Sequence, residues 1–277
     1  MEKLEAALAK AREARISASI GAASVDMAAA EAKRTRPTPP TKWDELTEIT
    51  ISQEQARQAR VVALTGGKVA TPYDMLRSRA IRLMKDAGWK RLAVTSPNAS
   101  CGKTTLALNL ALSLARQKDL RVLLIDLDLR RPNLHRLLNH VPTGSMHQVL
   151  SREIPFAEAA VRFGNNLAIG VNANAARHPA ELLHSISARE VLAEIEDQLK
   201  PDYVIFDMSP MLASDDNVGF LDHVNCALLV AAAESTTLQS IDICEKELAE
   251  LTNVLGVVLN KCRYADSSAG YGYEEYD

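Results

Sequence analysis

The chain has 277 residues, of which 47% are hydrophobic and 24% are charged, a composition that is ordinary for a folded globular protein. Its 32 basic and 35 acidic side chains leave a net charge of −3, which excludes a polybasic nucleic-acid-binding protein. Aromatic residues make up only 4%, too few for a platform on which bases stack, so we expect no nucleic-acid partner. The four cysteines lack Cys-x-x-Cys spacing, which argues against a zinc ribbon.

The amino-terminal fifty residues are predicted to lie outside the main domain. Residues 1–33 are rich in Ala, Glu, Lys and Arg, and Leu4 and Leu8 fall on one face of an expected helical extension. A helix this short is marginal alone in water, so the segment is either a docking helix or a solvated tail. Residues 34–50 open with a proline-rich run, which favours an extended linker. The chain shows neither a signal-peptide core nor a run of about 18 apolar residues, so we expect it to be cytoplasmic.

Two helices are predicted between this linker and the first strand. Ser52 and Gln55 have the spacing of a capping box, which marks the start of a short helix. Residues 72–87 have helical periodicity, with four apolar residues predicted to face inward: Leu76, Ala80, Leu83 and Met84. We therefore expect the main domain to span residues 51–263, followed by a flexible tail at residues 264–277.

Five short apolar runs are predicted to be strands: residues 91–95, 122–125, 203–206, 227–230 and 255–259. Their apolar residues are continuous rather than alternating, which is typical of strands covered by helices on both faces. Helical patterns separate several of them, at residues 103–117, 187–199 and 238–252. This alternation predicts an α/β fold with a parallel sheet flanked by helices on both faces.

The first predicted strand leads into a loop, residues 96–105, that resembles a phosphate-binding P-loop. Gly-Lys-Thr at a strand-to-helix turn directs backbone N–H groups and the helix dipole toward a phosphate. Lys103 is placed to reach the outer phosphates of a nucleotide, and the Thr104 hydroxyl is placed to bind Mg²⁺. The predicted nucleotide-binding residues of the loop are Ser100, Cys101, Gly102, Lys103, Thr104 and Thr105. Pro97 stands where the first glycine belongs, and a chance Gly-Lys-Thr is the alternative.

Three carboxylates follow predicted strands. Asp126 and Asp128 end the second strand two residues apart, so their side chains point to the same side. Asp207 ends the third strand, as a Walker B acid does when it binds Mg²⁺ directly or through water. Each acid alone is also consistent with an ordinary polar strand end. Together with the P-loop they predict a P-loop NTPase-type sheet, because ligands bind at the carboxyl ends of parallel strands.

These motifs resemble those of the bacterial tyrosine autokinases of capsule and exopolysaccharide systems, and the helical extension before the proline-rich linker resembles the variant found beside exosortase-type clusters. The resemblance covers residues 70–277 and includes these further segments: Asp126-Leu127-Asp128-Leu129-Arg130, Arg131-Pro132-Asn133-Leu134-His135, residues 179–185, Asp207-Met208-Ser209-Pro210, Asp215-Asp216 and residues 254–260. It implies ATP and Mg²⁺ as cofactors, with a metal site formed by Thr104, Asp128 and Asp207. It also implies catalytic roles for Lys103, Asp126, Asp128 and Asp207, with Asp126 accepting the tyrosine proton, and places Asn260 near the adenine.

The carboxyl-terminal tail carries most of the chain's six tyrosines: Tyr264, Tyr271, Tyr273 and Tyr276. Its few apolar residues predict an exposed segment, and a disordered end without function is the alternative. The resemblance implies that these tyrosines are the phosphoacceptors, modified in trans by a neighbouring subunit. It thus implies an ATP-dependent protein-tyrosine autokinase that regulates exopolysaccharide polymerisation and export.

The resemblance also implies partners. These are further copies of the chain in a homo-oligomeric ring, the cytoplasmic segment of a membrane polysaccharide co-polymerase (Wzz-like), and a cognate tyrosine phosphatase. The co-polymerase would hold the chain at the inner face of the cell membrane. Asp74 and Arg77 match the family's ring motif, Glu-x-x-Arg-x-x-Arg, but Ala80 stands at its last position, with Arg79 and Arg82 nearby. The ring motif is therefore incomplete.

Two residues of the P-loop bear on two alternative functions. Ser100 stands where the family usually has glycine, which would strain the loop if this position requires a positive φ. A strained loop would favour a non-catalytic nucleotide-binding adaptor of the co-polymerase. A partition-type ATPase is the second alternative, but such proteins carry lysine at the position of Asn98.

Overall fold

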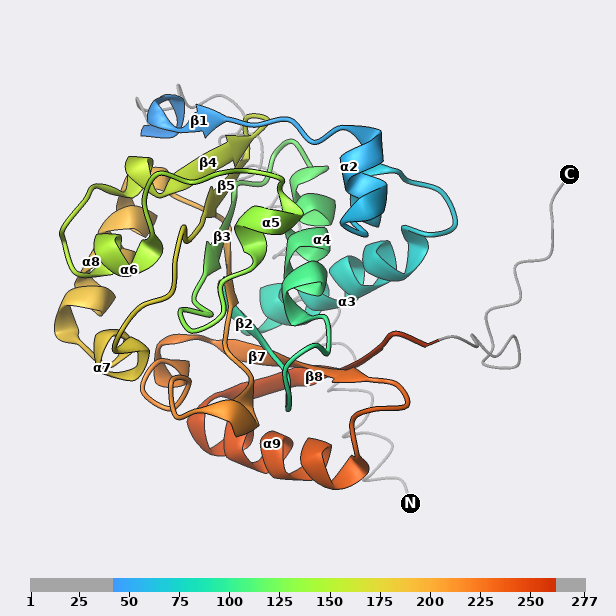
Figure 1. The fold of residues 1–277 in the computed structure, drawn as a ribbon. Coiled ribbons are helices and arrows are strands. Elements are labelled where there is room, and N and C mark those ends of the chain that lie inside the picture. Colours follow the sequence, from blue (N-terminus) through green and yellow to red (C-terminus); the bar gives the residue numbers. More distant parts are fainter. Residues whose placement is uncertain (1–41, 263–277) are drawn as a thin grey trace, which may run out of the picture. The chain divides into compact units, whose positions relative to one another are not determined.

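The computed structural model describes residues 42–262, which form a sheet covered by helices on both faces (Figure 1). Within this part of the chain the strand order is β1-β4-β5-β3-β6-β2-β7-β8. The strands are β1 (Thr47–Glu48), β2 (Arg91–Thr95), β3 (Val122–Asp126), β4 (Ala160–Phe163), β5 (Leu167–Gly170), β6 (Tyr203–Asp207), β7 (Cys226–Ala232) and β8 (Asn253–Asn260). Neighbouring strands are parallel except β4 and β5, which pair antiparallel. The predicted α/β class and the five predicted strands are confirmed.

The helices lie in two layers, with α3 and α4 over one face of the sheet and α8 and α9 over the other (Figure 1). The α-helices are α2 (Gln53–Gln58), α3 (Thr71–Ala87), α4 (Lys103–Ala115), α5 (Leu134–Leu137), α6 (Met146–Leu150), α7 (Pro179–Leu183), α8 (Ile186–Leu199) and α9 (Leu238–Leu251). Short 3₁₀ turns are η1 (Lys42–Glu45), η2 (Val62–Leu64), η3 (Phe156–Glu158), η4 (Met211–Ala213) and η5 (Leu221–His223). Among the described residues, no helix combines the length and apolar character that crossing a bilayer requires.

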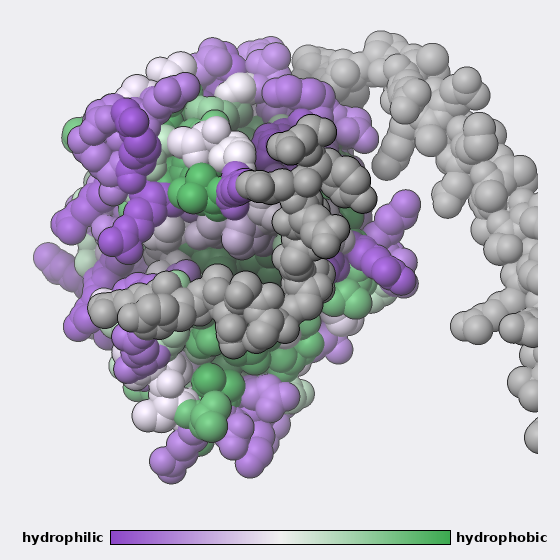
Figure 2. Space-filling model, turned by 90° about the vertical axis from the view of Figure 1, so that its right-hand side faces the viewer, coloured by the Kyte–Doolittle hydropathy of each residue, from purple (hydrophilic) through white to green (hydrophobic). Residues whose placement is uncertain are grey.

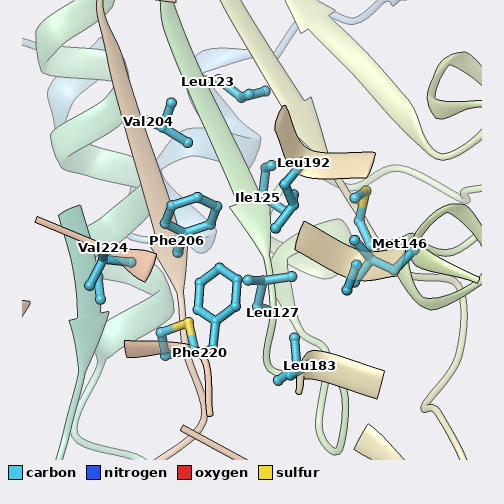
Figure 3. Close-up of a cluster of buried hydrophobic side chains, with 14 of the residues drawn as sticks. Leu123, Ile125, Leu127, Met146, Leu183, Leu192, Val204, Phe206, Phe220 and Val224 are labelled. Carbon is cyan, nitrogen blue, oxygen red and sulfur yellow. The ribbon is translucent and has the colours of Figure 1, made fainter. Parts of the chain in front are cut away.

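Helix α4 is almost completely buried between the sheet and α3, since all of its residues except Thr105 are buried. A helix that is apolar all round is expected in such a position. On the opposite face the core is built around Phe206 of β6 and Phe220, whose rings meet edge to face with centroids 5.1 Å apart (Figure 3). These two cores hold the carboxyl ends of β2, β3 and β6 in fixed positions.

The short helix after Ser52 has the predicted capping box: Ser52 Oγ accepts from the backbone N–H of Gln55, and Gln55 Oε1 accepts from that of Ser52. Helix α3 also forms where predicted, and Ala80 and Met84 are buried. Leu83, predicted to face inward, is instead 49% exposed. It lines a groove between α3 and β8, the edge strand, beyond which no further strand covers this side of the helix among the described residues.

The end of the expected linker is part of the folded domain. Trp43 is buried, and its Nε1–H donates to the carbonyl of Leu199 at 2.9 Å. Strand β1 then pairs in parallel with β4 at the edge of the sheet. Residues 42–50 therefore pack against the domain rather than forming an extended linker. Burial of the large apolar surface of Trp43 stabilises this arrangement. The predicted extension at residues 1–33 and the first part of the linker lie outside the described residues.

Strand β8 differs from the other predicted strands because it is an edge strand of the sheet. Val257 is 46% exposed and Leu259 is 61% exposed, so the apolar run there does not indicate burial on both faces. Figure 2 shows the side of the molecule where α3 lies, with hydrophobic residues gathered near its centre among hydrophilic ones.

Candidate functional site

The P-loop joins β2 to α4 and is fixed by a contact within the loop and by contacts from two other segments. Ser96 Oγ donates to the carbonyl of Asn98 at 2.7 Å, which closes the first turn of the loop. The Cys101 carbonyl accepts from Nδ2 of Asn260, at the end of β8, at 2.9 Å. Sγ of Cys101 is buried 3.6 Å from Oγ1 of Thr236. The loop is thus held by the segment that follows β7 and by the end of β8.

Two loop residues have backbone conformations that favour glycine. Gly102 has a φ of 92°, and a Cβ atom there would lie 2.3 Å from Nδ2 of Asn260, so a larger residue does not fit. Ser100 has a φ of 64°, in the left-handed region. Position 100 therefore has the positive φ at which a residue other than glycine is strained. Serine there costs about 1 kcal/mol or more in backbone strain.

Lys103 lies at the centre of the charged groups. Its Nζ is 2.7 Å from Oδ2 of Asp128, 3.4 Å from Oδ1 of Asp207 and 3.3 Å from Oγ1 of Thr104. Burial acts to lower the pKa of Lys103, but the charges of Asp207 and Asp128 outweigh it and raise the pKa above its usual range. The lysine is therefore a fixed cation at the amino-terminal end of α4, where a phosphate would also meet the helix dipole.

Asp126 and Asp207 face each other on neighbouring strands, as residues paired in the register of β3 and β6. Both are fully buried. Asp126 accepts hydrogen bonds from the backbone N–H groups of Asp128 at 3.2 Å and Leu134 at 3.4 Å. Burial, and then repulsion from Asp207, raise the pKa of Asp126 well above its ordinary value. Burial also raises the pKa of Asp207, although Lys103 opposes it.

The donor set fits a magnesium ion bound together with phosphate. Oδ2 of Asp207 is buried without a hydrogen-bond partner among the described residues, while the Thr104 hydroxyl bonds to the same carboxylate. No group of three His, Cys, Asp or Glu side chains in residues 42–262 is arranged to hold a metal by itself. This combination suits Mg²⁺, which commonly takes one or two carboxylates and completes its shell with phosphate and water. Thr104, Asp128 and Asp207 would hold it.

A cavity of about 460 Å³ opens over the P-loop. Of the predicted site residues, those on its wall are Ser100, Gly102, Lys103, Thr104, Thr105 and Asp128. Four others are not part of this lining: Cys101, Asp126, Asp207 and Asn260. Asn260 supports the P-loop backbone through Cys101, and its place near the adenine stays a prediction. The tail tyrosines Tyr264, Tyr271, Tyr273 and Tyr276 lie outside the described residues.

The sequence interpretation missed several cationic residues on the cavity wall. Arg60 and Lys261 reach it from segments far from the motifs, and no sequence pattern marks them. Arg130 and Arg131 also line it, and they were noted only as part of a matching segment. These four cations give the cavity a positive lining that suits a polyphosphate.

The segment after β6 is held by a buried polar network that the sequence did not predict. The Ser209 carbonyl accepts from Oγ1 of Thr95 at 2.7 Å and from Nδ2 of Asn217 at 2.8 Å. Arg130 then binds both carboxylate oxygens of Asp216, at 2.7 and 2.9 Å. This two-point contact connects the segments that follow β3 and β6, on two sides of the cavity.

Two residues of the incomplete ring motif are engaged within the domain. Asp74 accepts from Oγ of Ser113 at 2.8 Å and from Nη1 of Arg116 at 2.8 Å. Arg77 donates to the carbonyl of Ser113 at 3.1 Å. In this structure the pair therefore fastens α3 to α4.

Comparisons with known proteins show the family to which the chain belongs. The profile of the family described as "CobQ/CobB/MinD/ParA nucleotide binding domain" matches residues 92–271. The tyrosine-protein kinase YwqD of Bacillus subtilis is 30% identical over 221 residues, 78% of this chain and 91% of the relative. The tyrosine-protein kinase wzc of Salmonella typhi is 31% identical over 227 residues, 80% of this chain.

The kinase domain of the Escherichia coli tyrosine kinase ETK has a similar fold, with a TM-score of 0.68 and 24% identity over 86% of this chain and all of that domain. Several relatives are much longer than the matched region. The chain spans 31% of the Salmonella typhi protein and 24% of the tyrosine-protein kinase ptk of Acinetobacter johnsonii. It corresponds to one part of such proteins.

Strain at Ser100 gives a test of the P-loop. We expect Ser100→Gly to bind ATP with Mg²⁺ as tightly as wild type or up to about fivefold more tightly, since it relieves about 1 kcal/mol of strain. Ser100→Val should bind more weakly, because a β-branched residue resists positive φ. Equilibrium nucleotide binding measures both. Asn98→Val is the matched control, since exposed Asn98 has no positive φ and is not on the wall of the nucleotide cavity. Equal affinities for the two valine variants would contradict the strain.

Proposed function

The chain belongs to the bacterial tyrosine kinases, within the larger family of CobQ/CobB/MinD/ParA nucleotide-binding domains, and we propose that it transfers the γ-phosphoryl group of ATP to tyrosines of its own tail. The observation that carries this proposal is Lys103, buried at the mouth of the P-loop between Asp128 and Asp207. Transfer of a phosphoryl group depends mainly on positioning and on charge stabilisation. A buried cation beside two carboxylates supplies both.

ATP is bound by exchange of partners at Lys103. The ammonium group leaves its contact with Asp128 and meets the outer phosphates, while backbone N–H groups at the start of α4 donate to the same oxygens. Arg60 and Lys261 add positive charge on the cavity wall. Mg²⁺, held by Thr104, Asp128 and Asp207, neutralises phosphate charge when bound.

The transfer step requires an acceptor oxygen in line with the γ-phosphorus. The tyrosine oxygen forms the new bond to phosphorus, the bond to the bridging oxygen of ADP breaks, and the phenolic proton passes to a carboxylate. Asp126 is the proposed acceptor of that proton, because its raised pKa makes its carboxylate a stronger base. Asp128 is the second candidate, since it lines the cavity whereas Asp126 does not.

The acceptors proposed are Tyr264, Tyr271, Tyr273 and Tyr276, in a tail that reaches the site of a second copy. Each phosphorylation adds a charge of about −1.5 to −2, which loosens contacts between tails that are already acidic. The relatives include a protein named "Putative tyrosine-protein kinase in cps region" from Klebsiella pneumoniae. We accordingly place this chain in the control of exopolysaccharide polymerisation. Its partners there would be the co-polymerase segment at the inner membrane face and a phosphatase that resets the tail.

One observation favours a second function. The left-handed conformation of Ser100 strains the P-loop, and a weakened nucleotide site would leave the chain as an adaptor that binds nucleotide without transferring phosphate. Tail phosphorylation separates this adaptor from the kinase.

Mass spectrometry of the purified chain after incubation with Mg²⁺ and ATP tests the proposal. We expect phosphate on tail tyrosines in wild type and none in Lys103→Met, because that variant loses the cation that holds the outer phosphates. The same assay is repeated with the cytoplasmic segment of the co-polymerase added, in case the kinase needs that segment as an activator. An unmodified wild-type tail under both conditions would refute the kinase and favour the adaptor.

The identity of the base is tested by Asp126→Asn and Asp128→Asn. If Asp126 takes the proton, Asp126→Asn should slow tail phosphorylation about 100-fold or more while ATP affinity changes little. Asp128→Asn should weaken nucleotide binding in the presence of Mg²⁺ as well, because Asp128 is one of the residues that would hold the metal. The readouts are the single-turnover rate and the nucleotide dissociation constant. A near-normal rate in Asp126→Asn would assign the base to another group.

A further inference from the structure

A second cavity, of about 510 Å³, lies beside the nucleotide cavity and has a basic lining. Its charged or titratable wall residues are Arg130, Arg131, His135 and Arg136, and the remainder of the wall is Pro132, Asn133 and residues 173–175. No acidic side chain is part of this lining in the described structure. We call this cavity the arginine groove.

The arginine groove is continuous with the nucleotide cavity. Arg130, Arg131 and Asn133 line both, at the segment that follows Asp128. A ligand that enters the groove therefore adjoins the nucleotide cavity at the segment that follows Asp128.

Two of its arginines are available to a ligand. Arg130 is already bound to Asp216. Arg131 and Arg136 are exposed, and within residues 42–262 neither guanidinium has a carboxylate within ion-pair distance. His135 adds a buried Nδ1 atom with no hydrogen-bond partner in the same part of the chain. Burial lowers the pKa of His135, and the positive charges of Arg136 and His140 lower it further, as expected where positive charge is concentrated.

We propose that the arginine groove binds the acidic carboxyl-terminal tail of a second copy of this chain and so selects which tyrosines are phosphorylated. This inference rests on the proposed kinase function and adds its substrate recognition. The tail ends in Glu274-Glu275-Tyr276-Asp277, so two carboxylates precede its last tyrosine and one follows it. Arg131 and Arg136 match this charge, and arginine pairs with carboxylate in a two-point geometry.

The same groove binds a phosphorylated tail more tightly than an unmodified one. A phosphotyrosine brings about −1.5 to −2 charge and three acceptor oxygens to the two arginines. After the first transfer, the modified tyrosine moves into the groove while another tyrosine of the same tail reaches the transfer site. The tail is therefore modified at several tyrosines in succession.

Binding of a fluorescent peptide with the sequence of residues 264–277 to the full chain measures docking without catalysis. We expect Arg136→Gln to weaken binding about threefold, and Arg131→Gln with Arg136→Gln about tenfold, with larger losses for a phosphorylated peptide. Arg189→Gln is the matched control, since this exposed arginine lies on α8, outside the groove. Arg136→Gln is the decisive variant, because Arg136 does not line the nucleotide cavity.

A mixing experiment tests docking during transfer. Donor copies carry the substitutions Tyr264→Phe, Tyr271→Phe, Tyr273→Phe and Tyr276→Phe, and acceptor copies carry Lys103→Met. Arg136→Glu should slow phosphorylation of the acceptor when it is in the donor and have no effect when it is in the acceptor. Glu274→Lys with Glu275→Lys in the acceptor tail should restore the rate with the Arg136→Glu donor, which a merely misfolded donor would not allow.

The outcomes separate the two proposals. Peptide binding that is equal in wild type, Arg136→Gln and Arg189→Gln overturns the docking inference, whatever the kinase does. Groove-dependent peptide binding without transfer by the donor overturns the kinase and leaves the docking site standing. Groove-dependent binding to vesicles containing phosphatidylserine, with peptide binding unaffected, would assign the groove to a membrane surface instead.

Discussion

The ion pairs of Lys103 with Asp128 and Asp207 are the interaction on which the site depends. A buried charge is costly unless it is paired, and here one lysine faces three carboxylates that are almost inaccessible: Asp126, Asp128 and Asp207. One lysine leaves an excess of negative charge among these carboxylates, and burial first, then repulsion between carboxylates, raises the pKa of Asp126 and Asp207. A divalent cation relieves that excess, so the protein is arranged for Mg²⁺ and phosphate together.

The surrounding structure keeps these charges in place. Asn260 holds the P-loop backbone from β8, and the Arg130–Asp216 pair joins the segments that follow β3 and β6. Asp74 fastens α3 to α4, whose first residues carry the lysine. The geometry of the site is thus a property of the whole domain rather than of the motifs alone.

The central strands and the P-loop were predictable because their signals are local: continuous apolar runs, and Gly-Lys-Thr before a helix. Strands β4 and β5 were missed, because both are short and pair antiparallel within an otherwise parallel pattern. The exposure of Leu83 and Val257 depends on the position of β8 at the edge of the sheet, which no local pattern encodes. Arg60 and Lys261 were missed since only folding brings them to the cavity.

The arrangement of the site predicts that nucleotide binding depends on magnesium through Asp207. Its most direct test is equilibrium binding of a fluorescent ATP analogue to the full chain, with Mg²⁺ or with EDTA, in wild type and Asp207→Asn. We predict that Mg²⁺ tightens binding about tenfold or more in wild type, and that this dependence largely disappears in Asp207→Asn. The same affinity with and without Mg²⁺ in wild type, or an unchanged dependence in Asp207→Asn, would contradict the account.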